Sequence, residues 1–103
     1  MNMYQTISMR ELEQWLAYGR PMYLVDLRRR DQYRQGHLMG AVNIPFEELE
    51  DHVDELPGTI PIVFYCGKGS KSILACNRLG NLGYPVVNTG CGLAAYRGKY
   101  LVR

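Results

Sequence analysis

The sequence predicts an α/β fold in which helices flank both faces of a parallel sheet. Four short runs of apolar or β-branched residues read as buried strands, at about 23–27, 41–44, 62–66 and 86–89. Stretches with helical periodicity alternate with these runs, and this alternation is typical of parallel strands joined by helical crossovers. The chain has 103 residues, 47% of them hydrophobic and 21% charged, so we expect a single globular domain over residues 1–103.

The first predicted element is a helix that begins after Ser8. Ser8 and Glu11 have the spacing of a capping box, in which each residue satisfies a backbone N–H of the other. Leu12 and Trp15 then begin an apolar stripe, and Gly19 is a suitable stop. We interpret this segment as a helix that covers the core.

The strand at 23–27 contains one charged residue, Asp26, whose buried carboxylate needs a partner. The arginines at 28–30 could each supply it, and the sequence does not distinguish between them. We interpret these arginines as solvent-exposed residues at the start of a helix, with one of them paired to Asp26. The alternative is that they form a substrate-binding patch. One or two helical turns at 31–34 should then end at Gly36.

The next segment combines a glycine turn, a short strand and a helix. His37 beside the turn is interpreted as a hydrogen-bonded structural residue, with a catalytic base as the alternative. After the strand at 41–44, Pro45 suits the first position of a helix. Residues 46–56 place apolar side chains at helical spacing and acidic ones on the opposite face, which predicts an acidic amphipathic surface helix.

The chemistry is expected at Cys66, which ends the strand at 62–66. A glycine-rich loop follows: Gly67, Lys68, Gly69, Ser70, Lys71 and Ser72. A helix should come next, with an apolar face formed by Ile73, Leu74, Leu79 and Leu82. Unpaired N–H groups of such a loop and first helical turn favour negative charge, and the two lysines add to it. We therefore expect Cys66 to react as a thiolate nucleophile rather than to serve as a small core hydrophobe.

The last part of the chain brings a further loop to the same place. Gly83-Tyr84-Pro85 should close the helix, and a strand at 86–89 leads to a flexible turn at 90–92 and a short helix at 93–96. In parallel sheets the active crevice lies at the carboxyl ends of the strands, so Cys66, Asp26 and this turn should converge.

Composition excludes several classes of partner. The net charge of +2 gives no reason to expect nucleic acid or a membrane as a partner. No apolar run is long enough to span a bilayer, and the N-terminus turns polar before a signal peptide could form, so we expect a cytoplasmic protein. Three cysteines without CxxC spacing fit neither a disulfide framework nor a zinc site, and no metal or cofactor is expected. Cys76, in the middle of a helix, is interpreted as a core residue.

Four motifs occur in an order that resembles a known family. They are LVDLR at 24–28, GHLMGAVNIP at 36–45, CGKGSKS at 66–72 and CGLAAY at 91–96. They resemble the Asp-x-Arg strand end, the Gly-His-x-x-Gly-Ala-x-Asn-Ile-Pro signature, the Cys-x-x-Gly-x-Arg-Ser active loop and the closing Gly-Gly-x-x-x-Trp of single-domain rhodanese-like sulfurtransferases. The resemblance implies a sheet of about five strands, the fifth near 5–7, and structural roles for Asp26, Arg28 and His37.

The resemblance also implies a function. In this family the cysteine takes sulfane sulfur from thiosulfate or a protein persulfide and passes it to cyanide or another thiol, and Cys66 holds the matching position. The expected partners are therefore a small anionic donor or a persulfidated protein, and a thiol acceptor. Loop N–H groups from Gly67 to Ser72 would stabilise the persulfide anion. The oligomeric state is open.

The chain departs from the family pattern at two positions. Lys71 replaces the loop arginine and lacks its planar fork, so thiosulfate should bind weakly. Because Lys71 fills the anion-binding position, Lys71→Ala should raise the KM for an anionic donor more than Lys68→Ala. Cys91 replaces the first closing glycine, and it is either a tolerated small residue or a resolving cysteine that attacks a persulfide or sulfenate on Cys66.

Two alternative functions remain. A rhodanese-like domain can serve as a binding module or sulfur carrier for a partner protein. An arsenate reductase or phosphatase is less favoured, because these enzymes place an arginine where this chain has Ser72, and the loop is short.

Overall fold

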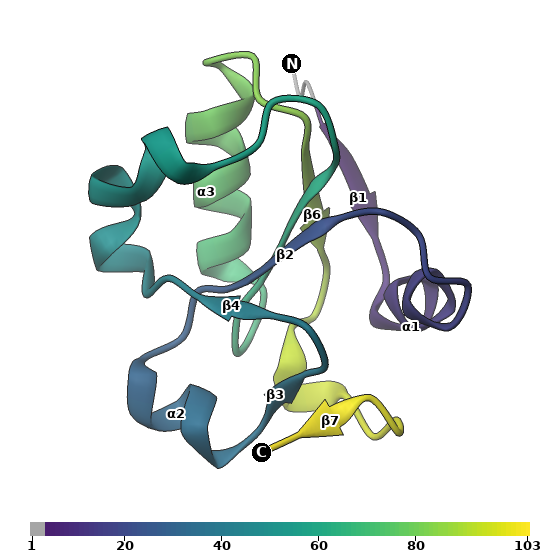
Figure 1. The fold of residues 1–103 in the computed structure, drawn as a ribbon. Coiled ribbons are helices and arrows are strands. Elements are labelled where there is room, and N and C mark those ends of the chain that lie inside the picture. The colour runs from purple at the N-terminus through teal and green to yellow at the C-terminus, as the bar shows by residue number, and fades with distance from the viewer. Residues whose placement is uncertain (1–3) are drawn as a thin grey trace.

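The computed structural model describes residues 4–103, and its centre is a five-stranded sheet (Figure 1). The strand order is β1-β6-β5-β2-β4, and all four pairings are parallel. The strands are β1 (Gln5–Ile7), β2 (Tyr23–Asp26), β4 (Val42–Asn43), β5 (Ile62–Tyr65) and β6 (Val86–Thr89). The predicted α/β class is confirmed, and so is the additional strand expected near residues 5–7.

Helices cover both faces of this sheet. The helices of the structure are α1 (Met9–Ala17), α2 (Arg30–Gln35), α3 (Ser70–Gly80) and two 3₁₀ helices, η1 (Phe46–Glu55) and η2 (Leu93–Ala95). Of these, α2 has no buried residue and does not cover the sheet. Figure 1 shows α3 and η1 on one face and α1 on the other. Side chains alternate between the two faces along β5. Phe64 belongs to the hydrophobic cluster that contains the buried apolar residues of α3, and Val63 belongs to the cluster that contains those of α1. The core therefore has two layers, one on each face of the sheet.

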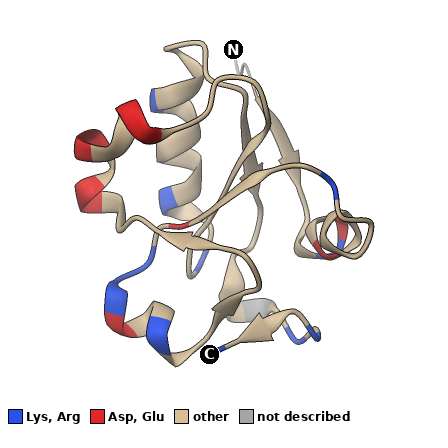
Figure 2. Ribbon diagram, viewed as in Figure 1, with Lys and Arg blue, Asp and Glu red and all other residues tan. Residues whose placement is uncertain are grey.

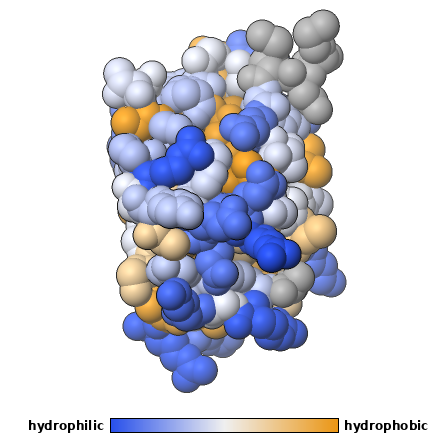
Figure 3. All heavy atoms as spheres, turned by 90° about the vertical axis from the view of Figure 1, so that its right-hand side faces the viewer, coloured by the Kyte–Doolittle hydropathy of each residue, from blue (hydrophilic) through white to orange (hydrophobic). Residues whose placement is uncertain are grey.

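The capping box of α1 forms as the sequence predicted. The Glu11 N–H donates to Ser8 Oγ at 3.0 Å, and the Ser8 N–H donates to the Glu11 carboxylate at 3.0 Å. Leu12 and Trp15 are the buried residues of this helix, and the Arg20 guanidinium lies 3.8 Å from the centre of the Trp15 ring. The outer surface on this side is mostly hydrophilic (Figure 3). This helix therefore covers the core with its apolar stripe.

The predicted apolar face of the helix after Cys66 was wrong at three of its four residues and right at Leu79, which is buried. Ile73, Leu74 and Leu82 are exposed, whereas the buried residues of α3 are Ser72, Ala75, Cys76 and Leu79. Small side chains face the sheet because they allow α3 to approach it closely, and larger ones would hold the helix away.

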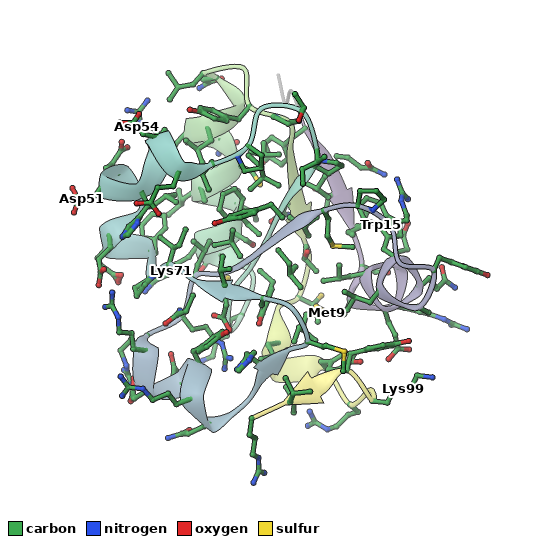
Figure 4. All side chains as sticks on the ribbon, viewed as in Figure 1. Met9, Trp15, Asp51, Asp54, Lys71 and Lys99 are labelled. Carbon is green, nitrogen blue, oxygen red and sulfur yellow. The ribbon has the colours of Figure 1, made fainter. Side chains whose placement is uncertain are left out.

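Residues 46–56 also differ in detail from the prediction. The segment is the 3₁₀ helix η1, Pro45 is its N-cap rather than its first helical residue, and Leu49 is its one buried residue. The acidic face is exposed as expected: Figure 2 shows acidic residues along η1, and Asp51 and Asp54 point outward in Figure 4. A 3₁₀ helix turns more tightly than an α-helix, which explains why the helical apolar spacing does not give one continuous buried stripe.

A second, smaller sheet was not predicted. Strand β3 (His37–Leu38) pairs antiparallel with β7 (Leu101–Val102), which ties the end of the chain beside α2. Two-residue strands carry no detectable period in a sequence, so their pairing depends on the fold around them. Within residues 4–103, no helix has the length and apolar character needed to cross a bilayer.

Candidate active site

Cys66 lies directly after β5, at the carboxyl end of the sheet. The residue is 2% exposed, and its sulfur accepts a hydrogen bond from the Gly69 N–H at 3.1 Å. Gly69 has a φ of +94° and is the N-cap of α3, so the loop turns through a conformation that favours glycine and then starts the helix. The sulfur is therefore held at the N-terminus of α3, where backbone N–H groups favour negative charge.

Ser72, in the first turn of α3, hydrogen-bonds back to the Cys66 loop. Its side chain is buried, and its hydroxyl donates to the Gly69 carbonyl at 3.1 Å. The Cys66 sulfur lies 3.8 Å from the Ser72 Oγ. A short, fully buried polar side chain at this position therefore helps to close the loop around the sulfur.

The turn at 91–94 packs against the Cys66 loop. The Leu93 N–H donates to the Cys66 carbonyl at 2.8 Å, and the Ala94 N–H donates to the Gly67 carbonyl at 2.9 Å. Gly92 has a φ of +62°, and a Cβ placed on it would lie 2.5 Å from the Cys66 carbonyl oxygen. Two motifs distant in the sequence thus hold one loop, which confirms the expected convergence of this turn with Cys66.

We expect Gly92→Ala to destabilise the protein by about 3 kcal/mol. The left-handed backbone strain of about 1–2 kcal/mol adds to the steric overlap of the new Cβ with the Cys66 and Gly67 carbonyl oxygens, which belong to the backbone and cannot move aside as a side chain can. Gly40→Ala is the matched control, since Gly40 has a φ of +84° but open space at its Cβ position. It should cost only about 1–2 kcal/mol, the strain alone. Urea unfolding measures both, and equal losses would show that the close approach at Gly92 is relieved cheaply.

Cys91 is exposed and has a φ of +65°, a strained backbone for a residue other than glycine. Its backbone nitrogen lies 3.2 Å from the position that a Cβ on Gly69 would take. Its turn thus lies beside the Cys66 loop, which a resolving cysteine requires. The resolving role itself stays a prediction.

Asp26 anchors the neighbouring strand end through a buried network. Arg28 Nη2 donates to Asp26 Oδ2 at 2.8 Å and Arg28 Nε donates to Oδ1 at 3.1 Å, while the Tyr65 hydroxyl also donates to Oδ2 at 2.8 Å. Burial and the Asp26 charge raise the pKa of the Tyr65 phenol far above its usual range, so it remains a donor. The partner of Asp26 is thus Arg28.

The other two arginines of the run form surface ion pairs, Arg29 with Asp31 and Arg30 with Glu48. Tyr65 was not among the predicted site residues, because a tyrosine inside an apolar run is typical of a core aromatic residue. Its hydroxyl also accepts the Leu38 N–H at 3.0 Å, so it joins two segments that are distant in sequence.

His37 has structural contacts. Its ring stacks on Tyr33 with centroids 3.7 Å apart, and its Nδ1 lies 2.8 Å from the Tyr33 carbonyl oxygen. It is not among the described residues that line the pocket over Cys66. This environment agrees with the interpretation of His37 as a structural residue.

A pocket of about 320 Å³ opens over Cys66, and we call it the Cys66 pocket. Its described lining residues are Arg28, Arg29, Gln32, Glu47, Cys66, Gly67, Lys68, Ser70 and Lys71. Figure 2 shows Lys and Arg gathered from α2 to the start of α3. Four of the lining side chains are cationic: Arg28, Arg29 and Lys71 are ion-paired, and the salt bridges found among residues 4–103 do not involve Lys68. Lys68 is therefore the charge most available to a small anion in this pocket.

Glu47, which was not among the predicted site residues, changes the role expected of Lys71. The Lys71 ammonium lies 3.1 Å from the Glu47 carboxylate, and Figure 4 shows Lys71 on the side of η1. The charge that should replace the family's arginine is therefore shared with a carboxylate.

We expect Glu47→Gln to lower the KM for thiosulfate about threefold, because it removes the one carboxylate among the described lining residues and frees Lys71. Glu48→Gln is the matched control, since Glu48 pairs with Arg30 outside this pocket. Steady-state kinetics at low salt measures the difference, which should shrink at high salt. An unchanged KM would show that Glu47 does not compete with the donor.

Cys76 is fully buried in α3, and burial raises the pKa of its thiol to about 12. At pH 8 only about one thiol in ten thousand would be ionised at such a pKa. We expect iodoacetamide at pH 8 to label exposed Cys91 and to spare Cys76 until the protein is unfolded in guanidinium, as read by peptide mass mapping. Labelling of native Cys76 at the rate of Cys91 would contradict its place in the core.

Fold and site together define a class of protein: a parallel α/β domain that holds a buried cysteine against the Gly69 N–H at the start of α3, on the lining of a pocket with basic side chains. The model of the rhodanese-like domain family matches residues 8–99, and the chain belongs to this family.

Three relatives illustrate the match. Human thiosulfate:glutathione sulfurtransferase is 31% identical, with 92% of this chain and 89% of that protein covered. The crystal structure of a rhodanese-like domain protein from Staphylococcus aureus has a TM-score of 0.87 at 23% identity, covers 95% of this chain and 96% of that chain, and supports the fold. An HTH-type transcriptional regulator of Mycobacterium tuberculosis is 46% identical over 52 residues, which span 50% of this chain and 23% of the regulator.

Proposed function

We propose that the protein is a sulfurtransferase that carries sulfane sulfur on Cys66 as a persulfide. The observation that carries this proposal is the position of the Cys66 sulfur, 3.1 Å from the Gly69 N–H at the N-terminus of α3 and on the lining of a cationic pocket. This surrounding stabilises an anionic sulfur and admits an anionic donor. Membership of the rhodanese-like family and the names of its relatives support the same chemistry.

Sulfur transfer takes two balanced steps. The Cys66 thiolate attacks the outer sulfur of thiosulfate, the S–S bond of thiosulfate breaks, and sulfite leaves with the electron pair. An acceptor thiolate, or cyanide, then attacks the outer sulfur of the Cys66 persulfide, and Cys66 leaves as a thiolate. No external oxidant or reductant is needed, because one sulfur atom moves between nucleophiles.

A sulfur carrier that another protein's persulfide loads is the second candidate. The ion pair between Lys71 and Glu47 favours it, because a partly neutralised lysine attracts a dianionic donor less strongly. Arsenate reductase or phosphatase chemistry has less support, since the Ser72 hydroxyl is buried and donates to Gly69 rather than offering a bidentate clamp.

The test is the intact mass of the protein after incubation with thiosulfate and no reductant, on wild type and on Cys66→Ser. A gain of about 32 Da on wild type alone is expected, one sulfur atom on Cys66. A loss of about two hydrogens that maps to Cys66 and Cys91 would instead support the resolving role of Cys91. No change in wild type would exclude thiosulfate as the donor and leave the protein-loaded carrier or a binding module.

A further inference from the structure

A second pocket, of about 390 Å³, adjoins the Cys66 pocket. We call it the Arg97 pocket. The two pockets share Arg28, Gln32, Gly67 and Lys68. Cys66 lines the Cys66 pocket and is not among the described lining residues of the Arg97 pocket. The shared residues form a rim, and at Gly67 this rim carries no side chain. A ligand in the Arg97 pocket can therefore lie next to the Cys66 pocket without entering it.

The Arg97 pocket has the chemistry of a site for an organic anion. Lys68 and Arg97 supply positive charge, and the salt bridges found among residues 4–103 involve neither of them. Its described lining contains no Asp or Glu, and Arg28 in the rim is already neutralised by Asp26. The amides of Gln32 and Gln35 and the apolar side chains of Leu93 and Leu101 also line the pocket, together with Gly36, Ala94 and Tyr96.

Arg97 is held at this pocket by its own turn. Its Nη1 donates to the Ala94 carbonyl at 3.1 Å and to the Tyr96 carbonyl at 2.9 Å. Its other guanidinium nitrogens can bind a carboxylate, and a guanidinium fixed in this way loses less freedom when a ligand arrives. Arg97 is thus prepared for an anion that does not touch Cys66.

We propose that the Arg97 pocket is the acceptor site, which binds the carboxylate-bearing body of an organic thiol while its sulfur reaches across Gly67. This inference rests on the proposed function and names the class of acceptor. The acceptor thiolate attacks the outer sulfur of the Cys66 persulfide, a new S–S bond forms on the acceptor, and the bond to Cys66 Sγ breaks to release the thiolate. A peptide-like thiol with free carboxylates suits this mixture of cations, amides and apolar contacts.

The test measures sulfur transfer from preloaded protein to two matched acceptors, glutathione and its diethyl ester, which has the same thiol but masked carboxylates. Wild type should show a KM about tenfold lower for glutathione than for the ester, the size of one charge-assisted contact. Arg97→Ala should remove this preference by raising the glutathione KM, with the ester KM unchanged. Arg34→Ala removes an exposed arginine that lines neither pocket, and it should keep the preference.

Equal KM values for the two acceptors in wild type, or the same loss in Arg34→Ala, would overturn the acceptor site. Binding of S-methylglutathione to unloaded protein, measured by calorimetry, tests the pocket without any sulfur on Cys66. Weaker binding in Arg97→Ala than in Arg34→Ala is expected, and equal binding would also overturn the inference. If Cys66 cannot be loaded, the proposed function fails, whereas the calorimetry still decides whether the pocket binds the thiol's body.

Discussion

Replacing Cys66 by serine should abolish sulfur transfer, with a fall in turnover of at least about a thousandfold. A hydroxyl oxygen at this position is barely ionised at neutral pH and cannot hold a sulfane sulfur. The fold should survive, because serine is nearly isosteric and its oxygen can still accept the Gly69 N–H. We expect the free energy of unfolding to change by no more than about 1 kcal/mol.

The measurement is turnover with thiosulfate, and with a persulfidated protein donor, beside urea unfolding of the same samples. Cys91→Ser is the matched control, the same atom exchanged at an exposed cysteine of the adjoining turn. Activity lost in Cys66→Ser and kept in Cys91→Ser is expected. Undiminished activity in Cys66→Ser would show that Cys66 does not carry the sulfur.

The largest loss of stability among polar substitutions should come from Asp26→Asn, about 2–4 kcal/mol. The Asp26 carboxylate is fully buried, and it accepts hydrogen bonds from Arg28 and Tyr65. In Asp26→Asn the side-chain NH₂ would face these donors, and the Arg28 guanidinium would lose its negative partner. Breaking a buried ion pair typically costs about 3–5 kcal/mol, and the 13% exposure of the Arg28 side chain relieves part of it.

Asp31→Asn is the matched control for Asp26→Asn, because it breaks an arginine pair that is more than half exposed. A loss below about 1 kcal/mol is expected there. Urea unfolding of both variants gives the comparison, and similar losses would show that burial of the Asp26 network contributes little.

Most of the fold could be predicted from the sequence. The strands within 23–27, 41–44, 62–66 and 86–89, the capped helix after Ser8 and the Cys66 loop follow from local patterns of apolar, polar and glycine residues. These patterns are short-range, so they determine an element's type well. They determine its orientation poorly: α3 exposes Ile73 and Leu74 because the packing distance to the sheet selected its small residues instead.

What the sequence determined by itself is the class of fold, the nucleophile candidate Cys66 and the loop that surrounds it. Tertiary structure alone decided which arginine neutralises Asp26, that Glu47 shares the charge of Lys71, and that Arg97 lines a pocket adjoining that of Cys66. The physical reason is that an ion pair or a pocket depends on distances between segments far apart in the chain. Local propensity fixes each segment, and only packing fixes how far their charged ends lie from one another.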